Sequence, residues 1–217
     1  MNRLVALWQT AVGKKVVMAV TGVLLVLFLV SHAVSNFLVF VNPQHLDDYG
    51  AWLRSFGPLL WVARLGLLTA AALHIVAAWQ LTQMSRIARP MDYSEHELRV
   101  STYAARTMRW GGVLLLAFLV FHILHLTLGT VHPDFREGMV SENLKTGLAV
   151  MPVALFYAVA MVFLGLHFGH GIWSMFQTLG FNHPAWNRSR AVVAISLAIL
   201  VAGGLLSIPL AALLGRL

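Results

Sequence analysis

The sequence predicts an all-α membrane protein, a bundle of five transmembrane helices that forms one domain over residues 1–217. Hydrophobic residues make up 59% of the chain, and the mean hydropathy is +0.78. Charged residues make up only 11%, against about 25% in a typical soluble domain. Long uncharged runs are stable where water is absent, whereas a β-barrel would show short alternating segments.

Five apolar segments are expected to form the helices. The first follows Lys14 and Lys15 and is longer than the apolar core of a signal peptide, so we expect it to remain as a helix. Each segment is long enough to cross a hydrocarbon core about 30 Å thick at a rise of 1.5 Å per residue. The segments cover residues 15–41, 58–84, 107–131, 149–178 and 189–214.

Basic residues indicate the orientation of the bundle, because cytoplasmic loops carry an excess of lysine and arginine. One end of the expected helices carries Arg3, Lys14, Lys15, Arg86, Arg89, Arg99, Arg106, Arg109, Arg188 and Arg190, and the other end carries Arg54, Arg64, Arg136, Lys145 and Arg216. We therefore expect a multi-pass protein of the prokaryotic cytoplasmic membrane, with its N-terminus in the cytoplasm and its C-terminus outside. The net charge of +7 fits this bias. Nucleic acid is not an expected partner, because no basic run is interleaved with aromatic residues.

Six histidines lie within the apolar segments, and polar groups inside a membrane are costly and commonly functional. A single one is as readily explained by a hydrogen bond between helices. Six of them, spread over the first four segments, favour a functional role. They are His32, His74, His122, His125, His167 and His170.

The depth of these histidines groups them into pairs. His32 and His122 fall in the outer half of the membrane, and His74 and His167 fall in the inner half, when each is measured from its helix end at 1.5 Å per residue. Zinc requires three or four nearby ligands, and no acidic residue lies near these positions. Haem iron requires two axial ligands on opposite faces of a flat ring, and bis-histidine ligation favours electron transfer.

Four strings resemble the haem-bearing helices of the dihaem, single-polypeptide cytochrome b subunit that anchors succinate dehydrogenase and fumarate reductase. They are LFLVSHAVSNF, LLTAAALHIVAAW, RWGGVLLLAFLVFHILHL and FLGLHFGHGIWSMFQTLG. The most specific piece is His-Phe-x-x-Gly-Ile-Trp-Ser around His167, Gly171, Trp173 and Ser174. The resemblance covers nearly the whole chain. It implies a bundle that holds two b-type haems.

The resemblance implies axial ligand pairs between the first and third helices and between the second and fourth. These pairs are His32 with His122 and His74 with His167, which agrees with the depth argument. His125 and His170 are the alternatives to His122 and His167. Residues three apart on a helix point about 60° apart, so we expect only one member of each doublet to reach the iron.

The resemblance also implies the partners and the reaction. A flavoprotein subunit and an iron–sulfur subunit are expected on the cytoplasmic face, formed by residues 1–14, 85–106 and 179–188. Electrons from succinate would pass through both haems to a quinone, with menaquinone as the usual partner of dihaem members. FAD and iron–sulfur clusters belong to the partner subunits, since this chain has no Gly-x-Gly-x-x-Gly motif and no cysteine. No residue of this chain is expected to take part in dicarboxylate chemistry.

The location of the quinone is open between two sites. Near the outer haem, Arg64 and Asn36 are candidate donors to a quinone oxygen, and Trp61 and Phe40 are candidate apolar walls. Arg64 is equally explained as a counter-ion for a haem propionate or as an arginine that extends to water. The competing site lies at the inner surface, with the candidates Trp173, Ser174 and Arg109.

Two other functions remain as alternatives. The cytochrome b subunit of a formate dehydrogenase or hydrogenase also holds two haems, but with four helices and a different distribution of histidines. A haem-free transporter that uses histidines as a proton relay would be expected to carry carboxylates or broken helices within the membrane. All eight acidic residues fall in the expected loops. In this respect the chain differs from those dihaem members that carry a carboxylate within a transmembrane helix.

Overall fold

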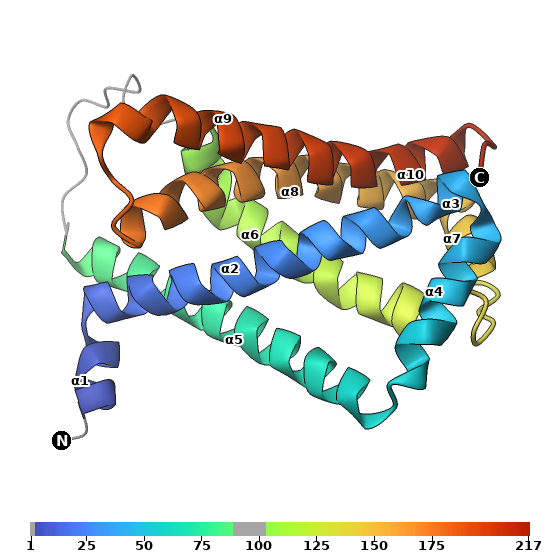
Figure 1. Ribbon diagram of the computed structural model, residues 1–217, viewed down its shortest axis with the longest axis horizontal. Helices are drawn as coiled ribbons and strands as arrows, with labels where there is room; N and C mark the ends of the chain where they lie inside the picture. Colours follow the sequence, from blue (N-terminus) through green and yellow to red (C-terminus); the bar gives the residue numbers. More distant parts are fainter. Residues whose placement is uncertain (1–2, 89–102) are drawn as a thin grey trace.

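The computed structural model describes residues 3–88 and 103–217, and these residues form helices joined by short connections (Figure 1). No strand occurs in these two ranges. The elements are α1 (Arg3–Gln9), α2 (Ala11–Asn36), α3 (Leu38–Val41), α4 (Pro43–Ser55), α5 (Pro58–Ile87), α6 (Tyr103–His122), η1 (Ile123–Thr127), α7 (Val140–Leu148), α8 (Met151–Thr178), η2 (Pro184–Trp186), α9 (Asn187–Ala198), η3 (Ile199–Gly203) and α10 (Gly204–Leu213).

Five stretches of these elements are long and apolar enough to cross a membrane. They are Ala11–Val41, Pro58–Ile87, Tyr103–Thr127, Met151–Thr178 and Pro184–Leu213. The predicted all-α fold with five transmembrane helices is therefore confirmed. Large apolar side chains such as Leu27, Leu65 and Ile195 are exposed on the outside of the bundle, where lipid takes the place of water.

The helix ends differ from the expected ranges for local reasons. The first span begins at Ala11 because the Thr10 hydroxyl accepts a hydrogen bond from the Gly13 N–H at 2.9 Å and caps the helix. The third span ends at Thr127, because Gly129 has φ of 72° and turns the chain. An added Cβ there would lie 2.2 Å from the Phe135 ring, so this turn requires glycine.

Helix α8 forms the centre of the bundle. Its buried residues face α2, α6 and the fifth span, which is made of α9, η3 and α10. They are Ala154, Tyr157, Ala160, Met161, Leu164, Phe168 and Ile172. In Figure 1, α2 and α5 lie close together near the N-terminus and diverge toward the opposite end, where α4 bridges them.

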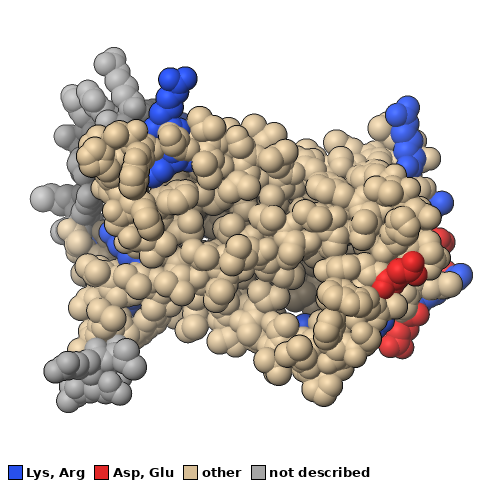
Figure 2. All heavy atoms as spheres, viewed as in Figure 1, with Lys and Arg blue, Asp and Glu red and all other residues tan. Residues whose placement is uncertain are grey.

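The two ends of the bundle differ in their charges. The N-terminal end carries the starts of α2 and α6 and the ends of α5 and α8, and the C-terminal end carries α4, α7 and the chain terminus (Figure 1). On the face drawn in Figure 2, the acidic side chains lie at the C-terminal end. There, Asp47 of α4 accepts hydrogen bonds from the backbone N–H and the hydroxyl of Ser141, at 2.8 and 2.6 Å. This contact joins α4 to α7.

Candidate functional site

Two histidines from facing helices form a pair toward the C-terminal end of the bundle. The ring centres of His32 on α2 and His122 on α6 are 5.9 Å apart, and the ring planes are at 87°. Nδ1 of His122 is 3.3 Å from the hydroxyl of Tyr157 on α8. Phe28 is stacked on His32 at 5.3 Å, and Phe118 lies 5.6 Å from His122. We call His32 and His122 the C-end pair.

A second pair lies closer to the N-terminal end. The ring centres of His74 on α5 and His167 on α8 are 6.3 Å apart. Nδ1 of His74 is 3.1 Å from the backbone carbonyl oxygen of Met18 and 3.3 Å from the hydroxyl of Thr21, both on α2. A carbonyl oxygen only accepts, so Nδ1 of His74 carries the hydrogen and Nε2 has a free lone pair. We call His74 and His167 the N-end pair.

The two pairs lie at different levels along the bundle. Gly22 lies against His74, since an added Cβ would be 3.6 Å from the ring, and His32 follows Gly22 by ten residues on α2. Tyr157 contacts His122, and His167 follows Tyr157 by ten residues on α8. Ten residues of helix extend over about 15 Å. Both helices therefore give the same separation between the pairs.

The spacing within each pair fits two axial ligands of one metal ion. Two imidazoles that bind a metal from opposite sides through bonds of about 2.0 Å have ring centres about 6.2 Å apart. The observed values of 5.9 and 6.3 Å lie on either side of this distance. In the described ranges, no group of three or more His, Cys, Asp or Glu side chains is placed to hold a metal ion. A site with only two protein ligands fits haem better than zinc.

One member of the N-end pair, His74, has the hydrogen-bond pattern of a metal ligand. A histidine that ligates a metal usually donates its other ring N–H to a carbonyl or a carboxylate, which fixes the tautomer. His74 has this arrangement through the Met18 carbonyl. Nδ1 of His167 is buried and has no hydrogen-bond partner among the described residues. The structure thus brings both expected pairs together, and ligation of haem by them stays a prediction.

The small residues near His167 divide into two groups. Added Cβ atoms at Gly165 and Gly169 would lie 3.4 Å from Ala202 and Ala198 of the fifth span, so these two glycines serve helix packing. Gly171 is one turn beyond His167, and an added Cβ there would meet nothing within 4 Å. Of these three glycines, only Gly171 therefore borders open space.

The two alternative ligands differ in their surroundings. His125, in the π-helical turn η1, is fully buried. Its ring is stacked on His132 at 4.9 Å, and its Nδ1 is 3.0 Å from the Tyr157 hydroxyl. His170 on α8 is only partly buried. Sequence reasoning missed Tyr157, and the one sign of it was a tyrosine hydroxyl within an apolar run.

The quinone candidates of the C-terminal end lie on separate helices. The guanidinium of Arg64 lies over the Trp61 ring at 5.0 Å on α5, so these two form one unit. Asn36 on α2 donates its side-chain N–H to the backbone carbonyl of His32 at 2.8 Å. Phe40 on α3 is 46% exposed. Helices α2 and α5 diverge toward this end of the bundle (Figure 1).

The candidates at the N-terminal end are engaged in other contacts. The Trp173 ring packs against the guanidinium of the buried Arg190 at 4.7 Å. Arg109 donates to the Ser85 hydroxyl at 3.4 Å. Ser174 is partly buried on α8. Much of the expected docking loop, including Arg89 and Arg99, lies outside the described residues.

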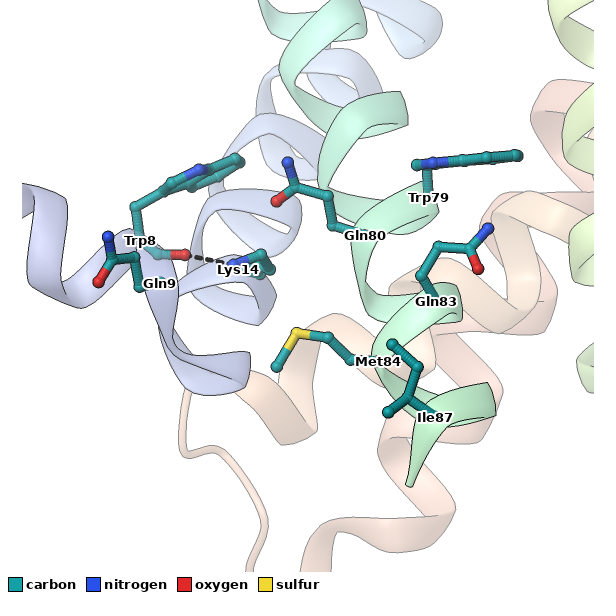
Figure 3. Close-up of a pocket in the computed structure, with 8 residues that line it drawn as sticks. All are labelled: Trp8, Gln9, Lys14, Trp79, Gln80, Gln83, Met84 and Ile87. Atoms are coloured by element: carbon teal, nitrogen blue, oxygen red, sulfur yellow. Dashed lines mark hydrogen bonds between the residues drawn. The ribbon is translucent and has the colours of Figure 1, made fainter. Parts of the chain in front are cut away.

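A groove of about 450 Å³ lies between α1, α2 and α5 at the N-terminal end (Figure 3). Its lining includes Trp8, Lys14, Trp79, Gln80 and Gln83. The Lys14 ammonium is buried, donates to the Trp8 carbonyl and lies over the Trp8 ring at 5.2 Å. Sequence reasoning missed this groove, although two glutamines within an apolar segment mark its position.

The five spans and the paired intramembrane histidines define a class of protein, a helical membrane protein with two pairs of facing histidines between its helices. A model of the succinate dehydrogenase/fumarate reductase transmembrane subunit family matches residues 84–203, and the chain belongs to this family. It is therefore a multi-pass membrane subunit of an oxidoreductase complex. The matched region includes His122 and His167 but begins after His32 and His74. No curated protein and no solved structure matches the chain.

Proposed function

We propose that this chain is the cytochrome b anchor that passes electrons from an iron–sulfur partner subunit through two bis-histidine haems to a quinone, with menaquinone as the acceptor. The observation that carries the proposal is the spacing of the two pairs, with ring centres 5.9 and 6.3 Å apart. Membership of the family favours this function over a formate dehydrogenase or hydrogenase subunit, and over a histidine-relay transporter.

The residues of this chain would hold and orient the two cofactors. His32 with His122, and His74 with His167, would be the axial ligands. Haem iron, when it is bound by two histidines, supplies one-electron transfer and has no open coordination position. The Met18 carbonyl fixes the ring of His74 so that Nε2 is free. The two levels, about 15 Å apart by helical rise, would place one carrier in each half of the membrane.

The orientation that we propose follows from the basic residues. Lys14, Lys15, Arg86, Arg106, Arg109, Arg188 and Arg190 lie at the N-terminal end of the bundle. The positive-inside rule then places this end in the cytoplasm of a prokaryotic cell. The flavoprotein and iron–sulfur subunits would dock there, so the N-end pair would receive electrons first and the C-end pair second.

We propose that the quinone binds near the C-end pair. A path through both levels has a purpose if the electrons leave at the far end. The Trp61 and Arg64 unit supplies an aromatic wall and guanidinium N–H donors, and no hydrogen bond of the Arg64 guanidinium is seen in residues 3–88 and 103–217. At the N-terminal end, Trp173 and Arg109 are engaged by Arg190 and Ser85.

The haem content of histidine variants tests the proposed function. The purified complex should contain two haems b per anchor chain by pyridine haemochrome assay. Alanine at His74 or His167 should remove one haem, and alanine at His32 or His122 should remove the other. His45→Ala, at an exposed position on α4, serves as the matched control and should keep both.

Absence of the b-type absorption band in the parent protein would contradict the proposed function. Retention of both haems in His74→Ala would show that the N-end pair does not ligate a haem. If His122→Ala keeps both haems and His125→Ala loses one, the ligand on the third span is His125.

A further inference from the structure

The hydroxyl of Tyr157 lies between two histidines of the third span. Its oxygen is 3.3 Å from Nδ1 of His122 and 3.0 Å from Nδ1 of His125. A tyrosine hydroxyl has one hydrogen, so it donates to one of these nitrogens and accepts from the other. The neutral imidazole that donates through Nδ1 has a bare Nε2, and the other imidazole carries its hydrogen on Nε2. Only one of the two histidines can therefore offer Nε2 to a metal ion.

The surroundings of His125 exclude it from that role. The side chain is fully buried, and its Nε2 has no hydrogen-bond partner among the described residues. An added Cβ on Gly147 would lie 2.7 Å from Nε2 of His125 and 2.7 Å from Nε2 of His132. The nitrogen thus faces the backbone of α7 at close range, which leaves no space for a flat ring beside it.

His132 closes the other side of this cluster. Its Nε2 donates to the Asn143 carbonyl at 2.7 Å, and its Nδ1 accepts from the Asp134 backbone N–H at 3.1 Å. Both ring nitrogens of His132 are therefore occupied, so His132 is not free to act as a metal ligand. His122, in contrast, faces His32 across 5.9 Å. If His122 is the ligand, as proposed above, its Nε2 is bare and its Nδ1 carries the hydrogen that the Tyr157 hydroxyl accepts.

We propose that Tyr157, itself held by His125, is the positioning residue of the C-end pair. It accepts a hydrogen bond from Nδ1–H of His122 and donates its own hydrogen to Nδ1 of His125. This inference rests on the haem ligation proposed above and deepens it. The buried His125 is then a support for the tyrosine rather than an alternative ligand.

The hydrogen bond has an electronic consequence for the iron. An acceptor on the outer N–H of a ligating imidazole raises the basicity of the ligand. A more basic ligand favours oxidised iron, so the hydroxyl of Tyr157 lowers the reduction potential of the haem held by the C-end pair. The N-end pair uses the backbone carbonyl of Met18 instead. A substitution at Tyr157 should therefore change the reduction potential of one haem, and the unchanged potential of the other haem serves as an internal reference.

The test is a spectroelectrochemical titration of the purified complex that carries Tyr157→Phe. We expect both haems to be retained, and the potential of the haem of the C-end pair to rise by about 59 mV, which is a tenfold change for a one-electron couple. The potential of the other haem should not change. His32→Ala, which retains only the haem of the N-end pair, assigns the two components. Tyr49→Phe, on α4, is the matched control and should leave both potentials at their parental values.

His125→Leu separates the support from the hydrogen bond to His122. This variant keeps the Tyr157 hydroxyl but removes the acceptor of its hydrogen. The reduction potential of the haem of the C-end pair should therefore rise, by less than in Tyr157→Phe. If Tyr157→Phe loses the haem of the C-end pair, His125→Leu supplies the measurement. The inference is wrong if the potentials of both haems stay unchanged or shift equally. It is also wrong if His125→Leu loses a haem while His122→Leu keeps both. A parent complex without two haems would instead overturn the proposed function.

Discussion

The close approach of Gly22 to His74 gives a prediction that depends on side-chain size. An added Cβ at Gly22 would lie 3.6 Å from Cε1 and 3.9 Å from Nδ1 of His74, which is ordinary van der Waals contact. Gly22→Ala should therefore be tolerated. Valine places two methyl carbons about 1.5 Å beyond Cβ, and its χ1 angle is restricted in a helix. A methyl carbon directed at the ring would then approach to about 2–3 Å, well inside contact distance.

The ring of His74 has little freedom to move away. Its Nδ1 is held at 3.1 Å from the Met18 carbonyl, one turn before Gly22 on the same helix. Overpacking of this kind costs about 1–3 kcal/mol. We expect Gly22→Val to separate α2 from α5 and break that hydrogen bond, so that His74 no longer faces His167 at ligand distance.

Haem content measures the outcome. Gly22→Ala should keep two haems per chain, and Gly22→Val should keep one, that of the C-end pair, by pyridine haemochrome assay against protein concentration. Gly66→Val is the matched control on α5, because an added Cβ at Gly66 meets nothing within 4 Å. If Gly22→Val binds two haems with parental spectra, the packing of Gly22 does not set the position of His74.

Three further predictions concern the ends of the bundle. Asp47→Asn should lower the free energy of unfolding by about 1–3 kcal/mol, because it weakens two charge-assisted hydrogen bonds. Thermal denaturation in detergent measures this change. The control Asp48→Asn, at an exposed side chain, should change the free energy of unfolding by less than about 0.5 kcal/mol. Arg64→Ala should slow quinone reduction about tenfold while succinate oxidation by a soluble dye continues at the parental rate, and a parental quinone rate would place the site elsewhere. Cysteines introduced at residues 179–188 should cross-link to the iron–sulfur subunit and those at 42–57 should not, and the reverse pattern would invert the orientation.

Hydropathy was sufficient to predict the spans, because a membrane helix is specified by the total apolar length of its segment. The ends depended on single residues that hydropathy does not describe, such as the capping hydroxyl of Thr10 and the positive φ of Gly129. Helices α4 and α7 were not predicted. Both are short and carry polar residues, so their composition resembles that of loops.

The relative depth of the histidines could be predicted because helical rise is constant, and the rings of His74 and His167 lie 6.3 Å apart as that argument expects. The link from Tyr157 to the two histidines of the third span could not. Its partners are 32 and 35 residues away in sequence, and a tyrosine within an apolar helix is compatible with many positions. The choice between neighbours such as His122 and His125 depends on which face each presents, and this requires coordinates.

The different hydrogen-bond acceptors of His74 and His122 give the two sites different capacities for change during evolution. The acceptor for His74 is a main-chain oxygen of α2, which every residue type at position 18 would provide. The acceptor for His122 is a side chain, which a single nucleotide substitution can remove. Mutation can thus remove the acceptor of the second site without altering the helix framework, whereas the main-chain acceptor of the first site persists whatever residue stands at position 18. In α2, the Thr21 hydroxyl, 3.3 Å from Nδ1 of His74, is a side chain through which protein engineers could also tune the first site.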